Sequence, residues 1–385
     1  MERKMTVRLT QKRLGVVAFA AAGLFSVINA QAGGTIAIGE DKSISVGFGM
    51  RTSFTSAKHG APDGNPSQDI TLDSARLYMS GSLNKNIKGM FNTEKSGDKD
   101  TFQVIDGNVQ FEITPEVTIW AGRFLSPSDR ANMAGPYYSL GGGYWANIAS
   151  RYGWNGGIIG RDNGVAVVGN LMDGKLGYAA GAFEGHTTWT YSGLGNPAVG
   201  SPAYVALKPA DALMYAARLQ YDFWDAEPGY YGTGNYLGAK DILAIGIAGR
   251  TQGDGAVSNT AKGDYSSSSV DFLMEKKIEG SGAASLEAAY YNYKTGDVFL
   301  SEQGKAFSAA GGYIFNDKVG SGKLQPFVRY QKFDADTNVN SKQYDLGVNY
   351  IIESYNAQIS GTYSNNQTTA LADVNTVKVT MQFQY

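Results

Sequence analysis

The chain has 385 residues, a formal net charge of −2 at pH 7, 50 glycines, 24 tyrosines and no cysteine. The lack of cysteine excludes a disulfide framework and any thiolate nucleophile or metal ligand. The charge is also unlike that of a nucleic-acid-binding protein, which is expected to be basic. The two histidines, His59 and His186, fall in expected loops without a patterned serine or aspartate partner. The sequence therefore offers no candidate catalytic residue, metal site or cofactor site.

Residues 1–32 have the three parts of a secretory signal peptide. An apolar stretch over residues 14–28 lies between a basic amino-terminal region and the small-residue pattern Ala30-Gln31-Ala32. We therefore expect cleavage before Gly33, which removes five of the 33 basic residues and one of the 35 acidic ones and leaves a net charge of −6. A membrane-anchor helix is the alternative, but fifteen apolar residues are few for one and no stop-transfer pattern follows.

From residue 44 onward, short segments alternate apolar and polar residues with a period of two, which predicts β-strands. In the segment 102–113, Ile105 and Val109 face one way, while Asp106 and Glu112 face the other. We predict sixteen strands, over residues 44–54, 72–83, 87–95, 102–113, 117–124, 164–171, 176–185, 213–223, 241–251, 268–277, 284–294, 306–315, 324–333, 343–352, 355–363 and 374–385.

The connectors between these strands alternate between short turns, such as Asn84-Lys85 and Asp173-Gly174, and longer loops. An even-stranded membrane barrel requires this alternation, and a barrel of this width leaves an aqueous channel. The link over residues 224–240 is too long for a standard turn, so a count that differs by two stays open. A soluble β-rich repeat protein is the alternative. It is disfavoured because the second face of the strands carries charged and amide side chains that a packed core could not satisfy.

Five segments stand out in order along the chain: Arg76-Leu77-Tyr78, Lys88-Gly89-Met90-Phe91-Asn92, Gly122-Arg123-Phe124, Gln325-Pro326-Phe327-Val328-Arg329-Tyr330 and the terminal strand. Together they resemble the outer-membrane porins of Gram-negative bacteria, and within them the phosphate-selective porin O/P-type family. The resemblance covers nearly all of residues 33–385, which we expect to form one barrel domain.

The resemblance implies a transmembrane antiparallel β-barrel of sixteen strands, a homotrimer, and a third extracellular loop folded into the lumen. It also implies contact with outer-membrane lipids, and with the outer-membrane assembly machinery through the C-terminal strand. Phosphate selectivity in that family relies on inward arginine ladders and lysine clusters. The mature chain here is net acidic and has no obvious lysine cluster in its loops.

The stretch over residues 125–162 is the best candidate site, because it follows the fifth strand and would be that third loop. It is rich in arginine and aromatic residues, and between Arg123 and Arg161 its only acid is Asp129. Folded into a lumen, it would form a locally positive, aromatic-walled constriction that attracts anions. The residues expected there are Arg123, Arg130, Tyr137, Tyr138 and Arg151. The alternative is a surface loop whose aromatic residues pack on each other or on a neighbouring subunit.

Charged residues on the inward faces of the strands are expected to line the pore wall. They are Arg51, Arg76, Arg218, Arg250, Arg329, Asp106 and Glu112. Rows of both signs can orient polar solutes, or they can pair with each other and hold the wall, and the sequence leaves both roles open.

These features predict an outer-membrane porin that forms a water-filled channel for passive diffusion of small hydrophilic solutes and ions, with a preference for anions. A channel specific for phosphate or another anion is one alternative. A non-conducting structural or adhesive barrel is another. Catalysis is not expected, because the chain lacks a nucleophile with a base and lacks metal ligands at a usual spacing.

Overall fold

The structure of the protein is a computed structural model that describes residues 33–61, 63–96, 101–143, 145, 148–151, 160–186, 212–258 and 261–385. The signal peptide expected over residues 1–32 lies outside the described residues. Among the described residues, no helix is long and apolar enough to cross a membrane.

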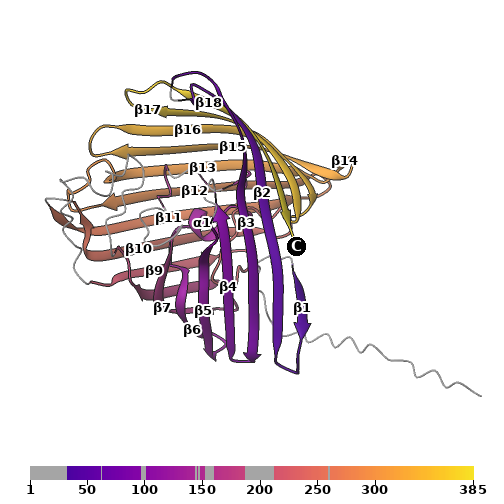
Figure 1. Cartoon of the computed structure of the whole chain (residues 1–385). Coiled ribbons are helices and arrows are strands. Elements are labelled where there is room, and N and C mark those ends of the chain that lie inside the picture. Colours follow the sequence, from indigo (N-terminus) through magenta and orange to yellow (C-terminus); the bar gives the residue numbers. More distant parts are fainter. Residues whose placement is uncertain are drawn as a thin grey trace, which may run out of the picture.

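The described residues form one antiparallel sheet in which sixteen strands close into a barrel (Figure 1). Those strands are β2 (Ser43–Lys58), β3 (Ser67–Asn84), β4 (Ile87–Ser96), β5 (Gln103–Thr114), β6 (Val117–Leu125), β7 (Arg161–Leu171), β8 (Leu176–Phe183), β9 (Met214–Asp222), β10 (Ile242–Val257), β11 (Lys262–Ile278), β12 (Gly282–Lys294), β13 (Gly304–Phe315), β15 (Gly322–Ala335), β16 (Asn340–Glu353), β17 (Ala357–Thr368) and β18 (Val374–Gln384). The prediction of sixteen strands is confirmed.

Three short elements accompany the barrel. Strand β1 (Gly34–Ala37) pairs with β2, and β14 (Lys318–Val319) pairs with the start of β15. Helix α1 (Arg130–Ala134) lies inside the ring of strands. The long link between β9 and β10 contains no strand, which resolves the count that the sequence left open.

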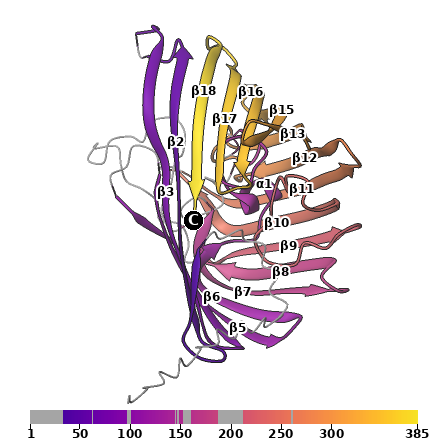
Figure 2. The ribbon, with the colours of Figure 1, turned by 90° about the vertical axis from the view of Figure 1, so that its right-hand side faces the viewer.

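The barrel closes where the last strand meets the first. Strand β18 pairs with β2 from Asn375↔Lys58 to Gln384↔Gly49, and the backbones of Phe48 and Tyr385 then exchange two hydrogen bonds of 2.7 and 2.8 Å. Strand β1 continues along the same edge of β2, beginning at the pair Gly34↔Val46. Strands β1 and β18 therefore pair with the same edge of β2. Figure 2 shows β18 and the C-terminus next to β2. Closure leaves no unpaired strand edge in the barrel.

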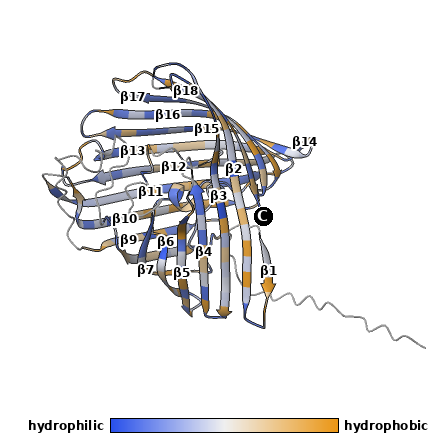
Figure 3. Ribbon diagram, viewed as in Figure 1, coloured by the Kyte–Doolittle hydropathy of each residue, from blue (hydrophilic) through white to orange (hydrophobic). Residues whose placement is uncertain are grey.

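Side chains alternate between an apolar outer face and a polar inner face, as the last strand shows. Met381 and Phe383 are exposed on the outer face of β18, while Thr380, Gln382 and Gln384 are buried on the inner face. Figure 3 shows the resulting mixture of apolar and polar residues along the strands. A soluble β-sandwich has the opposite distribution, because its buried face is apolar.

The pairing of β5 with β4 departs from the regular alternation that the sequence predicts. Asn92 pairs with Asp106 and Thr93 pairs with Val104, so Ile105 has no partner on β4. This bulge breaks the alternation, and Ile105 is only 1% exposed instead of lying on the outer face. The bulge lies beside the inward carboxylate of Asp106, which therefore projects from a locally bent part of the wall.

We expect the substitution Leu346→Arg to destabilise the barrel in lipid vesicles by about 2–4 kcal/mol. Leu346 is 61% exposed on the outer face, in the middle of β16, where lipid would surround a charged side chain. The measurement is equilibrium unfolding in urea. Thr362→Arg is the matched control, because Thr362 lines an internal cavity in the neighbouring strand. Equal destabilisation by both substitutions would contradict the assignment of the two faces.

Candidate functional site

Two segments cross the interior of the barrel. The first, which we call the third-loop segment, comprises the described residues of 126–160 and joins β6 to β7. The second, which we call the 223–241 connector, joins β9 to β10 from the opposite end. Both contain buried residues, and both contact inward-facing side chains of the strands. The width of a sixteen-stranded barrel makes room for such segments, because the wall side chains alone cannot fill it.

Wall arginines hold the third-loop segment by its backbone. Arg218 donates from Nη1 to the carbonyl oxygen of Ser128 (2.9 Å), and Arg250 donates to the carbonyl oxygens of Pro127 (2.9 Å) and Ser126 (3.0 Å). On the other side of the barrel, Arg51 donates to the carbonyl oxygens of Pro136 (3.3 Å) and Gly142 (2.5 Å). Charged donors make strong hydrogen bonds to carbonyl oxygens, so these contacts fix the path of the segment across the lumen.

The other predicted wall residues also face inward, and carboxylates pair with most of them. Arg76 forms an ion pair with Glu94, to which its Nη2 donates a hydrogen bond of 3.0 Å, and Arg329 donates to Asp345 (2.6 Å). The Arg329 guanidinium also lies 5.0 Å from the ring centroid of Trp145 in the third-loop segment.

Two acidic wall residues complete this set. Asp106 accepts hydrogen bonds from Asn92 (2.9 Å), Arg161 (3.2 Å) and Tyr231 (3.1 Å). Glu112 pairs with Lys88 (2.7 Å) near the β5–β6 turn and is partly exposed. The sequence left open whether the wall charges orient solutes or pair and hold the wall. Five of the seven form ion pairs with residues outside the predicted set, namely Arg76, Arg218, Arg329, Asp106 and Glu112. Arg51 and Arg250 donate to carbonyl oxygens.

Tyr137 packs against the wall made by β2 and β3. Its hydroxyl lies 3.0 Å from the hydroxyl of Ser74, and the centroid of its ring lies 5.8 Å from the guanidinium carbon of Arg51 and 5.2 Å from that of Arg76. A side chain at Gly49 would come within 3.3 Å of this ring, so the missing Cβ makes room for it. Burial raises the pKa of Tyr137, so the phenol stays neutral and the nearby charges come from the wall.

Two cavities lie along this wall. On β2, Gly47 lines one cavity and Arg51 the other, and Gly49, which lies beside the Tyr137 ring, falls between them. The loop-side cavity has a volume of about 330 Å³ and is lined by Arg51, Asp73, Ser74, Gly142, Gly143, Trp145, Arg329, Gln343, Thr362, Ser364, Thr376 and Lys378. The turn-side cavity has a volume of about 490 Å³, and its lining includes Ser45, Gly47, Tyr78, Ser80, Lys88, Trp120 and Tyr230. Along β3, Ser74 lines the first cavity and Tyr78 lines the second. Tyr137 contacts the wall between them.

Arg130 is the most buried charge of the third-loop segment, with a side chain 1% exposed. Its guanidinium binds both carboxylate oxygens of Glu227 (2.9 and 2.6 Å) and the carbonyl oxygen of Thr233 (2.8 Å). Its backbone N–H donates to Asp271 (3.1 Å). Burial opposes the charge on Arg130, but the nearby Glu227 carboxylate outweighs it and raises the pKa of the guanidinium. Arg130 is therefore a charged anchor between the two crossing segments.

The other three residues expected at the constriction have different surroundings. Tyr138 donates to Gln384 (3.2 Å) and packs against Tyr355. Arg151 forms an ion pair with Glu302, and its guanidinium lies 4.2 Å from the ring centroid of Phe333.

Arg123 was expected at the constriction, but it lies on the outer face of the barrel. It pairs across the strands with Asn163, which is exposed, and donates to that side chain (2.9 Å), while Trp120 and Phe124 occupy the inner face of β6. The prediction was wrong because it grouped Arg123 with the following loop. Arg123 belongs to β6, and the alternation of that strand places it on the outer face.

The sequence analysis missed the residues of the 223–241 connector. The length of this link was the only signal, and its contacts with the third-loop segment could not be read from the chain. In the described part of the chain, no group of three or more His, Cys, Asp or Glu side chains is arranged to hold a metal ion.

Comparisons with known proteins agree with this architecture. Residues 285–385, from within β12 to the end of the chain, match the family described as phosphate-selective porin O and P. No curated protein sequence matches the chain.

Three solved structures show the likeness in fold. An anion-selective porin from Comamonas acidovorans is 13% identical with a TM-score of 0.57, over 90% of this chain and 100% of that one. OprB of Pseudomonas putida is 10% identical with a TM-score of 0.62, over 89% and 94% of the two chains. A trimer form of OmpT, an outer-membrane protein of Vibrio cholerae, is 15% identical with a TM-score of 0.53, over 90% and 100%. The chain thus has the fold of the outer-membrane porins.

We expect Tyr137→Ala to raise single-channel conductance by roughly twofold, because it removes the ring that separates the two cavities. The measurement is the current through single channels in a planar lipid bilayer. Tyr215→Ala is the matched control, since Tyr215 is 60% exposed on the outer face and touches neither cavity. An unchanged conductance for Tyr137→Ala would show that the ring is not in the ion path.

Proposed function

We propose that the protein is a porin of the bacterial outer membrane, through which water, small hydrophilic solutes and ions diffuse passively, with a preference for anions. The observation that carries the proposal is the pair of cavities on either side of Tyr137, inside a closed barrel with an apolar outer face. An apolar outer face suits lipid and a polar inner face suits water. A channel of this kind uses no catalytic residue and no cofactor.

The preference for anions is supported by the residues of the loop-side cavity. Its lining contains the cationic side chains of Arg51, Arg329 and Lys378 and the carboxylate of Asp73. Lys378 pairs with Asp73 (3.2 Å), while Arg51 donates to carbonyl oxygens of the third-loop segment. The lining thus holds three cationic side chains and one carboxylate, which favours anions in the cavity. Such charges act most strongly where the pore is narrow.

The assembly and targeting of the protein follow from the same proposal. Residues 1–32 act as the export signal, and the mature barrel associates as a homotrimer surrounded by outer-membrane lipids. The trimer form of OmpT, an outer-membrane protein with the same fold, supports the oligomeric state. The aromatic C-terminal strand, whose last residue Tyr385 is 62% exposed, is the segment that the outer-membrane assembly machinery would bind.

A channel specific for phosphate or another anion is the second candidate function. It is favoured by the two segments that cross the lumen, since a narrow path discriminates better among solutes than a wide one. The match of residues 285–385 to the phosphate-selective porin O and P family points the same way. Phosphate that blocks chloride current at low concentration would select this candidate over a general porin.

We expect Arg51→Gln to lower the anion-to-cation permeability ratio by roughly twofold, because it removes a positive charge from the lining of the loop-side cavity beside Tyr137. The measurement is the reversal potential under a KCl gradient. Arg51→Lys keeps the charge and should retain most of the preference.

Arg123→Gln is the matched control for this measurement, because Arg123 lies on the outer face. If Arg51→Gln and Arg123→Gln both leave the reversal potential unchanged, the anion preference does not depend on Arg51. If the folded wild-type barrel carries no current, the structural or adhesive barrel replaces the porin as the account of the protein.

A further inference from the structure

The 223–241 connector spans the barrel from wall to wall. The Tyr231 hydroxyl donates to Asp106 of β5 (3.1 Å), and the Asn235 side chain exchanges hydrogen bonds of 3.1 and 3.0 Å with Gln325 of β15. In the ring of strands, β5 and β15 lie on nearly opposite sides. The next residue after Asn235 contacts a third strand, because the Tyr236 N–H donates to Glu275 of β11 (2.9 Å). The connector therefore crosses the lumen. The turns at the same end of the barrel are much shorter than this connector.

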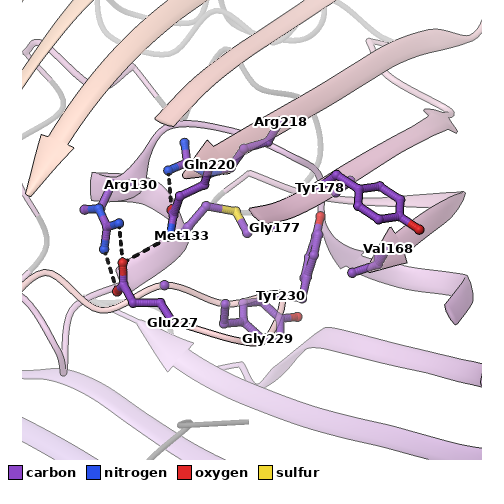
Figure 4. A pocket seen from close by; sticks show the side chains of 13 residues that line it. Arg130, Met133, Val168, Gly177, Tyr178, Arg218, Gln220, Glu227, Gly229 and Tyr230 are labelled. Atoms are coloured by element: carbon purple, nitrogen blue, oxygen red, sulfur yellow. Dashed lines mark hydrogen bonds and ion pairs between the residues drawn. The ribbon is translucent and has the colours of Figure 1, made fainter. Parts of the chain in front are cut away.

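The connector is hydrogen-bonded to the third-loop segment at several points. Arg130 donates to Glu227 through both terminal guanidinium nitrogens and also donates to the Thr233 carbonyl oxygen. The Gly234 N–H donates to the Tyr138 carbonyl oxygen (3.0 Å). Figure 4 shows the Arg130–Glu227 pair at the edge of a cavity of about 40 Å³ between the two segments. Glu227 is the connector's carboxylate in this junction, and its side chain is 5% exposed.

The connector also forms part of the boundary of the turn-side cavity. Tyr230 and Tyr231 line both this cavity and the small one beside Arg130. The ring centroids of Tyr230 and of Trp120 in β6 lie 4.9 Å apart, and the Tyr230 hydroxyl donates to the Leu125 carbonyl oxygen. A displacement of the connector would therefore join the small cavity to the turn-side cavity and widen the path past the third-loop segment.

We infer that the 223–241 connector is the second half of the channel constriction, and that Glu227 holds it in place by binding Arg130. Glu227 is then a residue that determines the size of solute the channel admits, although it lies on the segment opposite the third loop. The inference rests on the proposed porin function.

The first test is Glu227→Gln, which keeps the shape of the side chain and removes its charge. We expect conductance and the size limit for neutral solutes to rise, with conductance roughly twofold higher. Asp225→Asn is the matched control: Asp225 lies on the same connector, but it accepts a hydrogen bond from the Asp241 N–H near the end of the connector. Circular dichroism of each variant reports whether the barrel has formed.

A reversible cross-link tests whether displacement of the connector is the cause. A Cβ at Gly232 would lie 3.6 Å from the Cβ of Met133, which is within the range of a disulfide, and the chain has no other cysteine. In a Glu227→Gln chain that also carries Gly232→Cys and Met133→Cys, oxidation should restore the wild-type conductance, and a reductant should raise it again. The two single-cysteine variants are the controls for the substitutions themselves.

The outcomes separate this inference from the proposed function. If the wild-type barrel conducts and Glu227→Gln behaves like Asp225→Asn, the connector is a static support and the inference fails while the porin stands. If Glu227→Gln raises conductance and oxidation does not reverse it, displacement of the connector is not the cause and the inference again fails. If neither the wild type nor any folded variant conducts, both fail together. If the variant conducts and the wild type does not, Glu227 holds the pore closed and the inference stands.

Discussion

Buried arginine side chains that project into a wide barrel need hydrogen-bond acceptors or carboxylate partners. The rest of this structure depends on which segments provide those partners. Sixteen strands enclose more space than their own side chains fill, and an unsatisfied buried charge is costly. Arg218, Arg250 and Arg51 bind carbonyl oxygens of the third-loop segment, while Arg130 of that segment binds Glu227 of the connector. The loops are therefore partners that the wall requires, and their positions decide where water and solutes can pass.

This arrangement links the stability of the wall to the selectivity of the path. The carboxylates that pair with arginines, such as Glu94 with Arg76 and Asp345 with Arg329, neutralise much of the inward charge. The field in the path therefore depends on where the charged side chains lie relative to the cavities, as Arg51 lies on the loop-side cavity. The number of inward residues of each sign cannot give the charge selectivity, because the two charges of an ion pair largely cancel in the field that a passing ion meets.

The sequence was sufficient for the barrel, since strand alternation and turn residues are local signals. The period-two pattern of β18 and the turn at Asp173 and Gly174, which both have positive φ angles (55° and 84°), specify their own conformations. The bulge at Ile105 was missed because it depends on pairing with β4. The inward direction of the wall arginines followed from alternation, but their partners did not, because Arg250 and Ser126 are 124 positions apart in the chain. The role of the 223–241 connector was missed for the same reason.

The central claim is that the barrel keeps a water-filled path although two segments cross it. The most direct test is the current of the purified, folded wild-type chain in a planar lipid bilayer, recorded as single-channel steps in KCl. The account predicts discrete, ohmic steps that carry more chloride than potassium. Folded barrels that insert and carry no steady current would contradict it, because the cavities on either side of Tyr137 would then not connect.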